Sequence, residues 1–109
     1  RCNVRVSRVR RPTPIGVYPG GDSPEGVTDL TGNVLEWTSS AARPYPYAPE
    51  DGREDLDVAP DVPRVLRGGS WINAFQDVRA SVRYPYQPDA RDAIDGLRLA
   101  CGLESDAGV

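Results

Sequence analysis

The stretch Asp29-Leu-Thr-Gly-Asn-Val-Leu-Glu-Trp37 decides the fold, because it brings a turn, an apolar run and two carboxylates together in a short segment. Glycine and asparagine both tolerate positive φ, so Gly32-Asn33 predicts a reversal or kink of the backbone. Residues 34–38 then have the composition of a half-buried strand. We expect Trp37, one of two tryptophans, to anchor a core.

Two further segments have strand character. Residues 64–71 contain the pair Gly68-Gly69, which permits a bulge or a close approach by another backbone, and Trp71 is expected to return a large side chain to the core. Residues 95–101 are predicted to form a final strand. Three strands joined by long loops make a sparse sheet, and such loops are uncommon unless they have a function.

The composition indicates one modest domain over residues 1–109. The chain contains 11 glycines and 11 prolines, which favours a loop-rich fold of short strands with few helices. It has no histidine, which excludes a histidine-based general base or metal cage within these residues. No apolar run is long enough to cross a bilayer and no signal peptide pattern is present, so we predict no membrane partner and assign no compartment. Cys2 and Cys101 either pair or stay free.

Charge is distributed unevenly along the chain. Residues 1–19 carry five arginines and no acid, although the net charge of the whole chain is -3. A basic arm can bind phosphate backbones, but this one has no lysine and one aromatic residue; a solvated or acid-paired face is preferred, and no nucleic-acid partner is predicted. Residues 42–63 are rich in proline and acid and predict a surface excursion. Within it, Tyr45-Pro46-Tyr47 is either a partner contact or a lid on the core.

Several motifs follow one another in a fixed order over nearly the whole chain. They are Cys2-Asn3, residues 13–19, residues 23–27, Asp29-Leu30, residues 32–38, residues 65–71 and residues 96–99. In this order they resemble the formylglycine-generating-enzyme-like, or sulfatase-modifying-factor, family. The resemblance implies an α+β, C-type-lectin-like domain of the formylglycine-generating-enzyme type, loop-rich with short antiparallel strands. It covers only the C-terminal half of the family's domain, so we expect a missing N-terminal segment to be a partner of this chain.

The chain departs from the family at the copper ligands. In the copper-dependent enzymes of the family, two cysteines follow the glycine-glycine-serine-aromatic motif, one soon after it and the other five positions later. Asn73 and Val78 stand in those places here. Copper(I) needs soft thiolate ligands, which neither residue provides. We therefore expect no copper, and we assign no catalytic residue.

A structural calcium site is expected around the turn. Asp29 and Glu36 flank the turn, and released carbonyls there suit a hard cation that prefers oxygen ligands. The resemblance implies the same set, because the family commonly binds calcium through the residue at Asp29, main-chain oxygens at Gly32 and Val34, and the carboxylate at Glu36. The alternative is that Asp29 and Glu36 cap the turn and form an arginine salt bridge.

A second group with this fold is similar in residues 72–95. The variable proteins of diversity-generating retroelements display a randomised ligand-binding surface between the glycine-glycine-serine-tryptophan motif and the last strand. Residue types produced by their mutagenesis at adenines occur here at Asn73, Ala74, Phe75, Tyr84, Tyr86, Ala90, Asp92 and Ala93. Tyrosines separated by a proline also offer a large contact area with little rotamer entropy to lose. The alternative is that Tyr84 and Tyr86 pack inward.

Three hypotheses follow. The preferred one is a non-catalytic ligand-binding domain, a variable protein of the retroelement kind, that binds a protein or other macromolecule through residues 72–95. The second is an oxidoreductase of the same family, such as an iron-dependent oxidase, whose metal ligands lie in the missing N-terminal half. The third is a regulatory or docking module attached to another domain.

Overall fold

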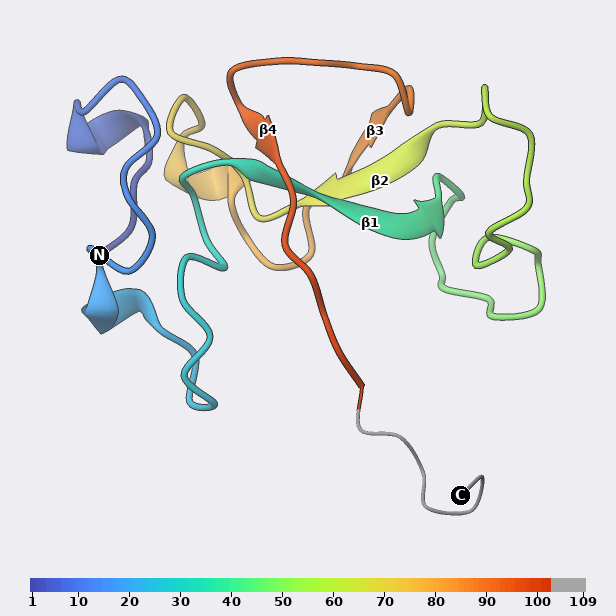
Figure 1. Ribbon diagram of the computed structural model, residues 1–109, viewed down its shortest axis with the longest axis horizontal. Coiled ribbons are helices and arrows are strands. Elements are labelled where there is room, and N and C mark those ends of the chain that lie inside the picture. The colour runs from blue at the N-terminus through green and yellow to red at the C-terminus, as the bar shows by residue number, and fades with distance from the viewer. Residues whose placement is uncertain (103–109) are drawn as a thin grey trace.

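The sheet at the centre of the protein has four short strands. The computed structural model describes residues 1–102, and the strand order is β3-β2-β1-β4 (Figure 1). The strands are β1 (Leu35–Ala41), β2 (Arg64–Arg67), β3 (Tyr84–Tyr86) and β4 (Asp95–Gly96). Helical structure in these residues is limited to the 3-10 turns η1 (Arg5–Ser7), η2 (Pro19–Gly21) and η3 (Phe75–Asp77). The predicted loop-rich α+β class is confirmed, and none of these turns has the length or apolar character needed to span a membrane.

The pairing of the strands differs from the prediction at both edges. β2 pairs antiparallel with β1 and β3, as expected, but β4 pairs parallel with β1. β3 was not predicted, because Pro85 interrupts it; proline is tolerated there because β3 is an edge strand. The prediction of a strand over residues 95–101 is wrong beyond Gly96. There the chain leaves the sheet, with Leu99 92% exposed, while the Arg98 side chain turns to the Asp29 carbonyl.

The core consists of small aliphatic side chains rather than indole rings. Its members are Val4, Leu35, Ala41, Val65, Leu66 and Val78, each no more than 5% exposed. Trp37 and Trp71 are only half-buried, so the prediction that they anchor the core is wrong. Four short strands enclose little volume, and an indole at the boundary can pack one side while its N–H reaches a polar partner. Trp71 does so, with Nε1 donating to the Ala93 carbonyl at 3.2 Å.

The predicted kink at Gly32-Asn33 is confirmed, with φ of +76° and +69°. A Cβ on Gly32 would lie 2.4 Å from the carbonyl oxygen of Asn3, so only glycine fits there. The Asn33 backbone donates to the Asn3 carbonyl at 2.8 Å, and its carbonyl accepts from Trp71 N at 2.9 Å. Its buried Oδ1 accepts from Thr13 N at 2.8 Å and from Asn3 Nδ2 at 3.3 Å. One residue thus joins the N-terminal segment, β1 and the segment after β2.

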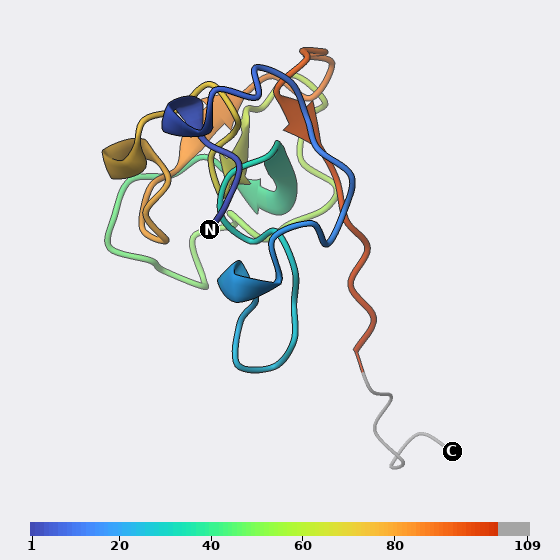
Figure 2. The ribbon, with the colours of Figure 1, turned by 90° about the vertical axis from the view of Figure 1, so that its left-hand side faces the viewer.

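The close approach predicted for the second glycine pair is also confirmed. A Cβ on Gly68 would lie 2.8 Å from the Leu30 carbonyl oxygen, and Gly68 accepts a 2.7 Å hydrogen bond from Gly32 N. Figure 2, which looks nearly along β1, shows loops from both halves of the chain surrounding this strand. The loops therefore pack on the sheet through close backbone contacts, which explains the requirement for glycine.

The remaining surface predictions have mixed outcomes. The five arginines of residues 1–19 are exposed and make no ion pair within residues 1–102, so an acid-paired face is not found there. The absence of a nucleic-acid partner stays a prediction. Residues 42–63 form the predicted excursion, but Arg53 within it is only 3% exposed. Cys2 and Cys101 are both free.

Asn33 offers a direct test of this framework. We expect Asn33→Ala to reduce the free energy of unfolding by about 3 kcal/mol, because buried partners lose their hydrogen bonds and alanine resists positive φ. Chemical denaturation measures this change. The exposed neighbour variant Thr31→Ala is the control and should stay within about 0.5 kcal/mol of the wild type. Equal losses in the two variants would contradict the role assigned to Asn33.

Candidate functional site

The strand register separates two faces of the sheet. Leu66 lies opposite both Trp37 on β1 and Tyr84 on β3, whereas Val65 lies opposite Pro85. Because successive side chains in a strand point to opposite faces, Tyr86 shares the face of Leu66 and Tyr84. We call this the Leu66 face, and the opposite one the Val65 face.

The connection from β3 to β4, residues 87–94, crosses the sheet because these strands form its two edges. Figure 1 shows it as a wide loop joining β3 and β4, and we call it the arch. Residues of the arch and Trp37 line a shallow hollow together, which places the arch over the Leu66 face. The predicted ligand-binding residues Ala90, Asp92 and Ala93 all belong to this arch.

Main-chain atoms hold the arch in place. Leu35 N donates to the Ile94 carbonyl at 2.6 Å, and Trp71 Nε1 donates to the Ala93 carbonyl. Within the arch, Ala90 N donates to the Gln87 carbonyl at 2.9 Å. No side chain of residues 87–93 makes a hydrogen bond within the part of the chain that the structure describes. The path of the backbone is thus independent of which side chains the arch carries.

Tyr86 and two aspartates form the electrostatically unusual part of this surface. Partial burial, and then the charges of Asp95 and Asp92, raise the pKa of Tyr86. Partial burial, and then the charge of Asp92, raise the pKa of Asp95. Both Asp95 carboxylate oxygens are buried without a hydrogen-bond partner among residues 1–102. Negative charge at the end of the arch is therefore poorly compensated by its surroundings.

The other predicted ligand-binding residues lie apart from the arch. Phe75 is on η3 and 59% exposed, beside the half-buried Ala74. The Asn73 side chain is already occupied, because its Oδ1 accepts from Ser70 N at 2.8 Å and Ser70 Oγ at 2.9 Å. The Tyr84 hydroxyl donates to the Asp77 carbonyl at 3.2 Å, and burial raises its pKa. The structure thus brings together Tyr86, Ala90, Asp92 and Ala93, and leaves Phe75 as a separate exposed ring.

The parts played by Trp37 and Trp71 at this surface were not predicted from the sequence. Trp37 lines the hollow beneath the arch, and Trp71 fixes the arch through its indole N–H. No local pattern assigns these roles, because each depends on a segment far away in the sequence. The sequence does place Trp71 next to the predicted surface, because it directly follows the glycine-glycine-serine turn that leads into residues 72–95. It does not indicate which group the indole contacts.

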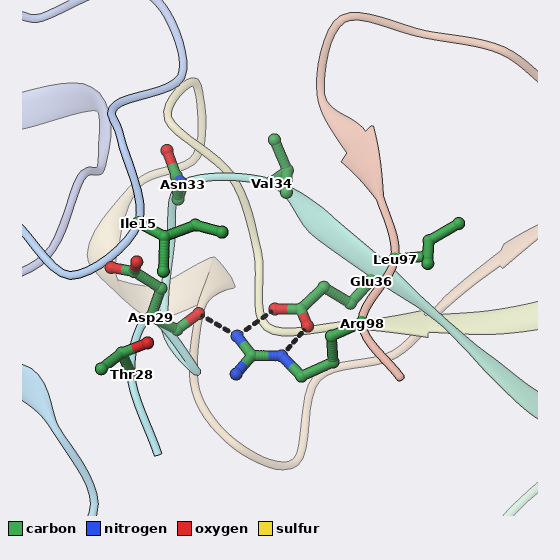
Figure 3. Close-up of a pocket in the computed structure, with 8 residues that line it drawn as sticks. All are labelled: Ile15, Thr28, Asp29, Asn33, Val34, Glu36, Leu97 and Arg98. Atoms are coloured by element: carbon green, nitrogen blue, oxygen red, sulfur yellow. Dashed lines mark hydrogen bonds and ion pairs between the residues drawn. The ribbon is translucent and has the colours of Figure 1, made fainter. Parts of the chain in front are cut away.

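The residues predicted to bind calcium lie together beside β1. Figure 3 shows the Arg98 guanidinium between the Asp29 carbonyl and the Glu36 carboxylate. Arg98 Nη2 donates to Asp29 O at 3.0 Å and to Glu36 Oε2 at 2.9 Å, while Arg98 Nε donates to Glu36 Oε1. Asp29 Oδ2 accepts from Gly16 N at 3.0 Å. The hydrogen bond to Glu36, and then the negative charges of Glu36 and Asp29, raise the pKa of Arg98.

This donor set does not fit calcium as it is arranged. The Glu36 oxygens and the Asp29 carbonyl already accept from Arg98, and residues 1–102 contain no cluster of three or more cysteine or acidic side chains that could hold a metal ion. The arginine salt bridge, the alternative interpretation, is present. Binding of calcium by Asp29, Gly32, Val34 and Glu36 stays a prediction, and it requires Arg98 to move.

The two positions of the family's copper ligands have local roles here. Asn73 caps the Ser70 backbone, and Val78 is 5% exposed. A Cβ on Gly69 would lie 2.1 Å from Val78 Cγ1, so the valine packs directly on that glycine. Both side chains thus stabilise the turn after β2.

Comparison with known proteins places the chain in a wider context. The sequence matches the model of the sulfatase-modifying factor enzyme 1-like domain over residues 3–103. Hercynine oxygenase of Mycolicibacterium smegmatis is 40% identical over 102 residues, which cover 84% of this chain and 23% of that protein. Inactive C-alpha-formylglycine-generating enzyme 2 of Bos taurus is 33% identical over 101 residues, which cover 88% of this chain and 29% of that protein. This chain thus spans less than a third of the length of either relative.

A solved structure has a similar fold. Treponema denticola variable protein 1 superposes with a TM-score of 0.66 and 22% sequence identity, over 88% of this chain and 34% of that chain. At this level of identity the likeness concerns the fold alone. It confirms the predicted C-type-lectin-like class.

The raised pKa of Asp95 predicts that this residue makes a pH-dependent contribution to stability. Its pKa is raised from 3.8 in the folded protein, so its stabilising contribution is complete below pH 3.8 and is lost as the pH rises through the folded pKa. We therefore expect Asp95→Asn to raise the denaturation midpoint at pH 7, and this advantage to vanish below pH 3.8. Asp89→Asn, an exposed substitution in the arch, is the control. An advantage that persists unchanged in acid would contradict the assignment.

Arg98 and calcium should compete for the same oxygens. In the presence of a chelator, we expect Arg98→Gln to cost about 1 kcal/mol, since the ion pair is partly exposed. Added calcium should restore most of this loss in the variant and have little effect on the wild type. Thermal unfolding with and without calcium measures both effects, and Arg79→Gln is the matched control. If calcium leaves Arg98→Gln unchanged, the predicted calcium site is wrong.

Proposed function

We propose, starting from the fact that this chain belongs to the sulfatase-modifying factor enzyme 1-like family, that it is a non-catalytic ligand-binding domain of the retroelement variable-protein kind. Its ligand is a protein or another macromolecule, and contact is made through the surface of residues 72–95. The similarity in fold to Treponema denticola variable protein 1 supports this proposal.

The arch is the observation that carries the proposal. Its backbone is held by the Leu35 amide, the Trp71 indole and hydrogen bonds between main-chain atoms of the arch itself. Its side chains make no hydrogen bond within residues 1–102 and are therefore free to change without changing the path of the chain. A surface that must accept many side chains needs this separation between a fixed backbone and variable contacts.

The chemistry of the surface suits recognition of another macromolecule. Phe75 and Ile72 are 59% and 50% exposed and supply apolar contact area. Tyr86 presents a partly buried ring, whose rotamer entropy is already reduced, beside the carboxylates of Asp92 and Asp95. Rigid aromatic groups next to directional acceptors are typical of binding surfaces. Asn73 and Tyr84, which already have partners within the fold, serve as its support.

A second candidate function is an oxygenase within a longer protein. The observation in its favour is the 40% identity to hercynine oxygenase of Mycolicibacterium smegmatis. In this case residues outside the chain supply the metal ligands, and the chain supplies a wall of the substrate site. Iron analysis of the longest natural protein that contains this chain, followed by oxygen consumption with hercynine, distinguishes this candidate from the first.

Sequence variation among copies of the protein should be concentrated at positions whose side chains do not hold the backbone in place. We expect sequencing of many copies of the source locus to show substitutions at Phe75, Tyr86, Ala90, Asp92 and Ala93, together with a nearby template repeat. Uniform variation without a repeat would remove the retroelement assignment.

Because the arch backbone does not depend on its side chains, substitutions in the arch should have little effect on stability. Ala90→Ser, Asp92→Ser and Ala93→Asn should each change the free energy of unfolding by no more than about 0.5 kcal/mol, because their side chains make no hydrogen bond. Asn73→Ala is the contrasting variant and should cost about 1 kcal/mol, because the Ser70 amide and hydroxyl lose their acceptor. Denaturant unfolding compares the four variants. Large losses in the arch would contradict the tolerance proposed for it.

A further inference from the structure

A cavity on the Val65 face lies apart from the arch. Its volume is about 250 Å³. Ala41 and Val65, both buried, supply apolar lining, and Tyr45 and Tyr47 line it from the 42–63 loop. The rest of the lining comes from Thr38, Ser40 and three arginines, namely Arg53, Arg67 and Arg83. The tyrosine pair therefore does more than cover the core, because it lines a space together with apolar and positively charged residues.

Arg53 is the arginine whose charge is already neutralised. Its Nη2 lies 2.7 Å from Asp51 Oδ2, and its Nε donates to both carboxylate oxygens of Asp51 at 3.1 Å. The same Nη2 donates to the Pro44 carbonyl at 3.1 Å. The hydrogen bond from Arg53 lowers the pKa of Asp51. Arg53 thus fixes the loop that carries the tyrosines.

Arg67 and Arg83 carry charges that no carboxylate neutralises. Within residues 1–102 neither guanidinium has an acidic oxygen closer than 4.0 Å. Arg67 Nη1 donates to the Ala80 carbonyl at 2.8 Å, and Arg83 Nη1 donates to the Arg43 carbonyl at 2.7 Å. Neutral acceptors therefore hold both guanidinium groups in position, one for Arg83 and two for Arg67, whose second acceptor is the Tyr45 hydroxyl. The other donors of both groups remain available.

The tyrosines add aromatic surface to these cations. The guanidinium carbon of Arg83 lies 3.7 Å from the ring centroid of Tyr45, and that of Arg53 lies 5.0 Å from the ring centroid of Tyr47. Arg67 Nη2 also donates to the Tyr45 hydroxyl at 3.4 Å. Stacking on a ring orients a guanidinium and leaves its edge free for a planar anion.

Nearby acids do not cancel this charge. Glu36 lies across from Arg67 in the sheet, but both of its oxygens accept from Arg98. Glu54 accepts a hydrogen bond from Ser40 at the edge of the cavity and has no oxygen within 4.0 Å of the Arg67 or Arg83 guanidinium. The side of the cavity formed by Arg67 and Arg83 therefore stays positive, and a partly enclosed positive site attracts anions.

We propose that this cavity binds a small aromatic carboxylate. The carboxylate accepts hydrogen bonds from the free donors of Arg67 and Arg83, and the ring of the ligand lies against Tyr45, Tyr47 and the apolar lining at Val65. Planar guanidinium groups recognise carboxylates through paired hydrogen bonds, and the combination of paired cations with aromatic walls selects an acid that also has an apolar ring. This site is distinct from the arch and does not depend on the function proposed for it.

Benzoate and benzamide test this proposal, because they have the same shape and differ in charge. Nuclear magnetic resonance of the longest natural protein containing this chain follows the ring signals of Tyr45 and Tyr47 during titration with each compound. We expect benzoate to shift these signals with an affinity at least about tenfold higher than that of benzamide, since hydrogen bonds to a charged group contribute more than neutral ones. Equal affinities, or no benzoate-dependent shift, would overturn the proposal.

Variants locate the site. Arg83→Gln should weaken benzoate binding by about tenfold, and Arg83→Lys should retain part of it because the charge remains. Arg79→Gln, an exposed arginine outside the cavity, should bind benzoate as the wild type does. Asp92→Ser in the arch should also leave binding unchanged. If Arg83→Gln fails to fold, Arg67→Gln should still weaken binding, because it removes the other guanidinium that lines the cavity. Equal binding by every folded variant would place benzoate elsewhere.

Discussion

The hydrogen bonds of Asn33 are the constraint on which the rest of this structure depends. Its amide side chain and backbone connect Asn3, Thr13 and Trp71, which belong to segments far apart in the sequence. These bonds are possible because Gly32 and Asn33 adopt positive φ, and because Gly32 lets the Asn3 carbonyl approach closely. A small aliphatic core offers little apolar burial, so a buried polar junction of this kind carries more of the specificity of the fold.

The same junction extends to the proposed ligand-binding surface. Asn33 accepts from the Trp71 backbone, the Trp71 indole donates to the Ala93 carbonyl, and the Leu35 amide donates to the Ile94 carbonyl. The arch is thus connected to the centre of the fold through main-chain atoms and one indole ring. This arrangement explains how a protein with so little regular structure can keep a surface loop in a fixed position without using hydrogen bonds from the side chains of that loop.

Arginine performs several different tasks in this lysine-free chain. Arg98 joins the turn before β1 to the segment after β4, and Arg53 orders a proline-rich loop around Asp51. Both are neutralised by carboxylates. Arg67 and Arg83 instead donate to carbonyls, and Arg83 also stacks on Tyr45, which leaves both charges exposed to a cavity. The contrast between neutralised and free guanidinium groups distinguishes structural arginines from those available to a ligand.

The sequence by itself determined the features that depend on local chemistry. The kink at Gly32-Asn33, the strand that follows it, the need for glycine at Gly68 and the family all follow from short ordered motifs, because backbone conformation and turn chemistry are properties of neighbouring residues. Only the tertiary structure decided the pairing of β3 despite Pro85, the end of β4 at Gly96, the half-buried tryptophans and the occupied side chain of Asn73. It also decided that Arg98 lies where calcium was expected, and that Arg83 stacks on the ring of Tyr45 beside a cavity. Each of these outcomes is a contact between distant segments, and the free energy of such a contact depends on what the rest of the chain places opposite the residue.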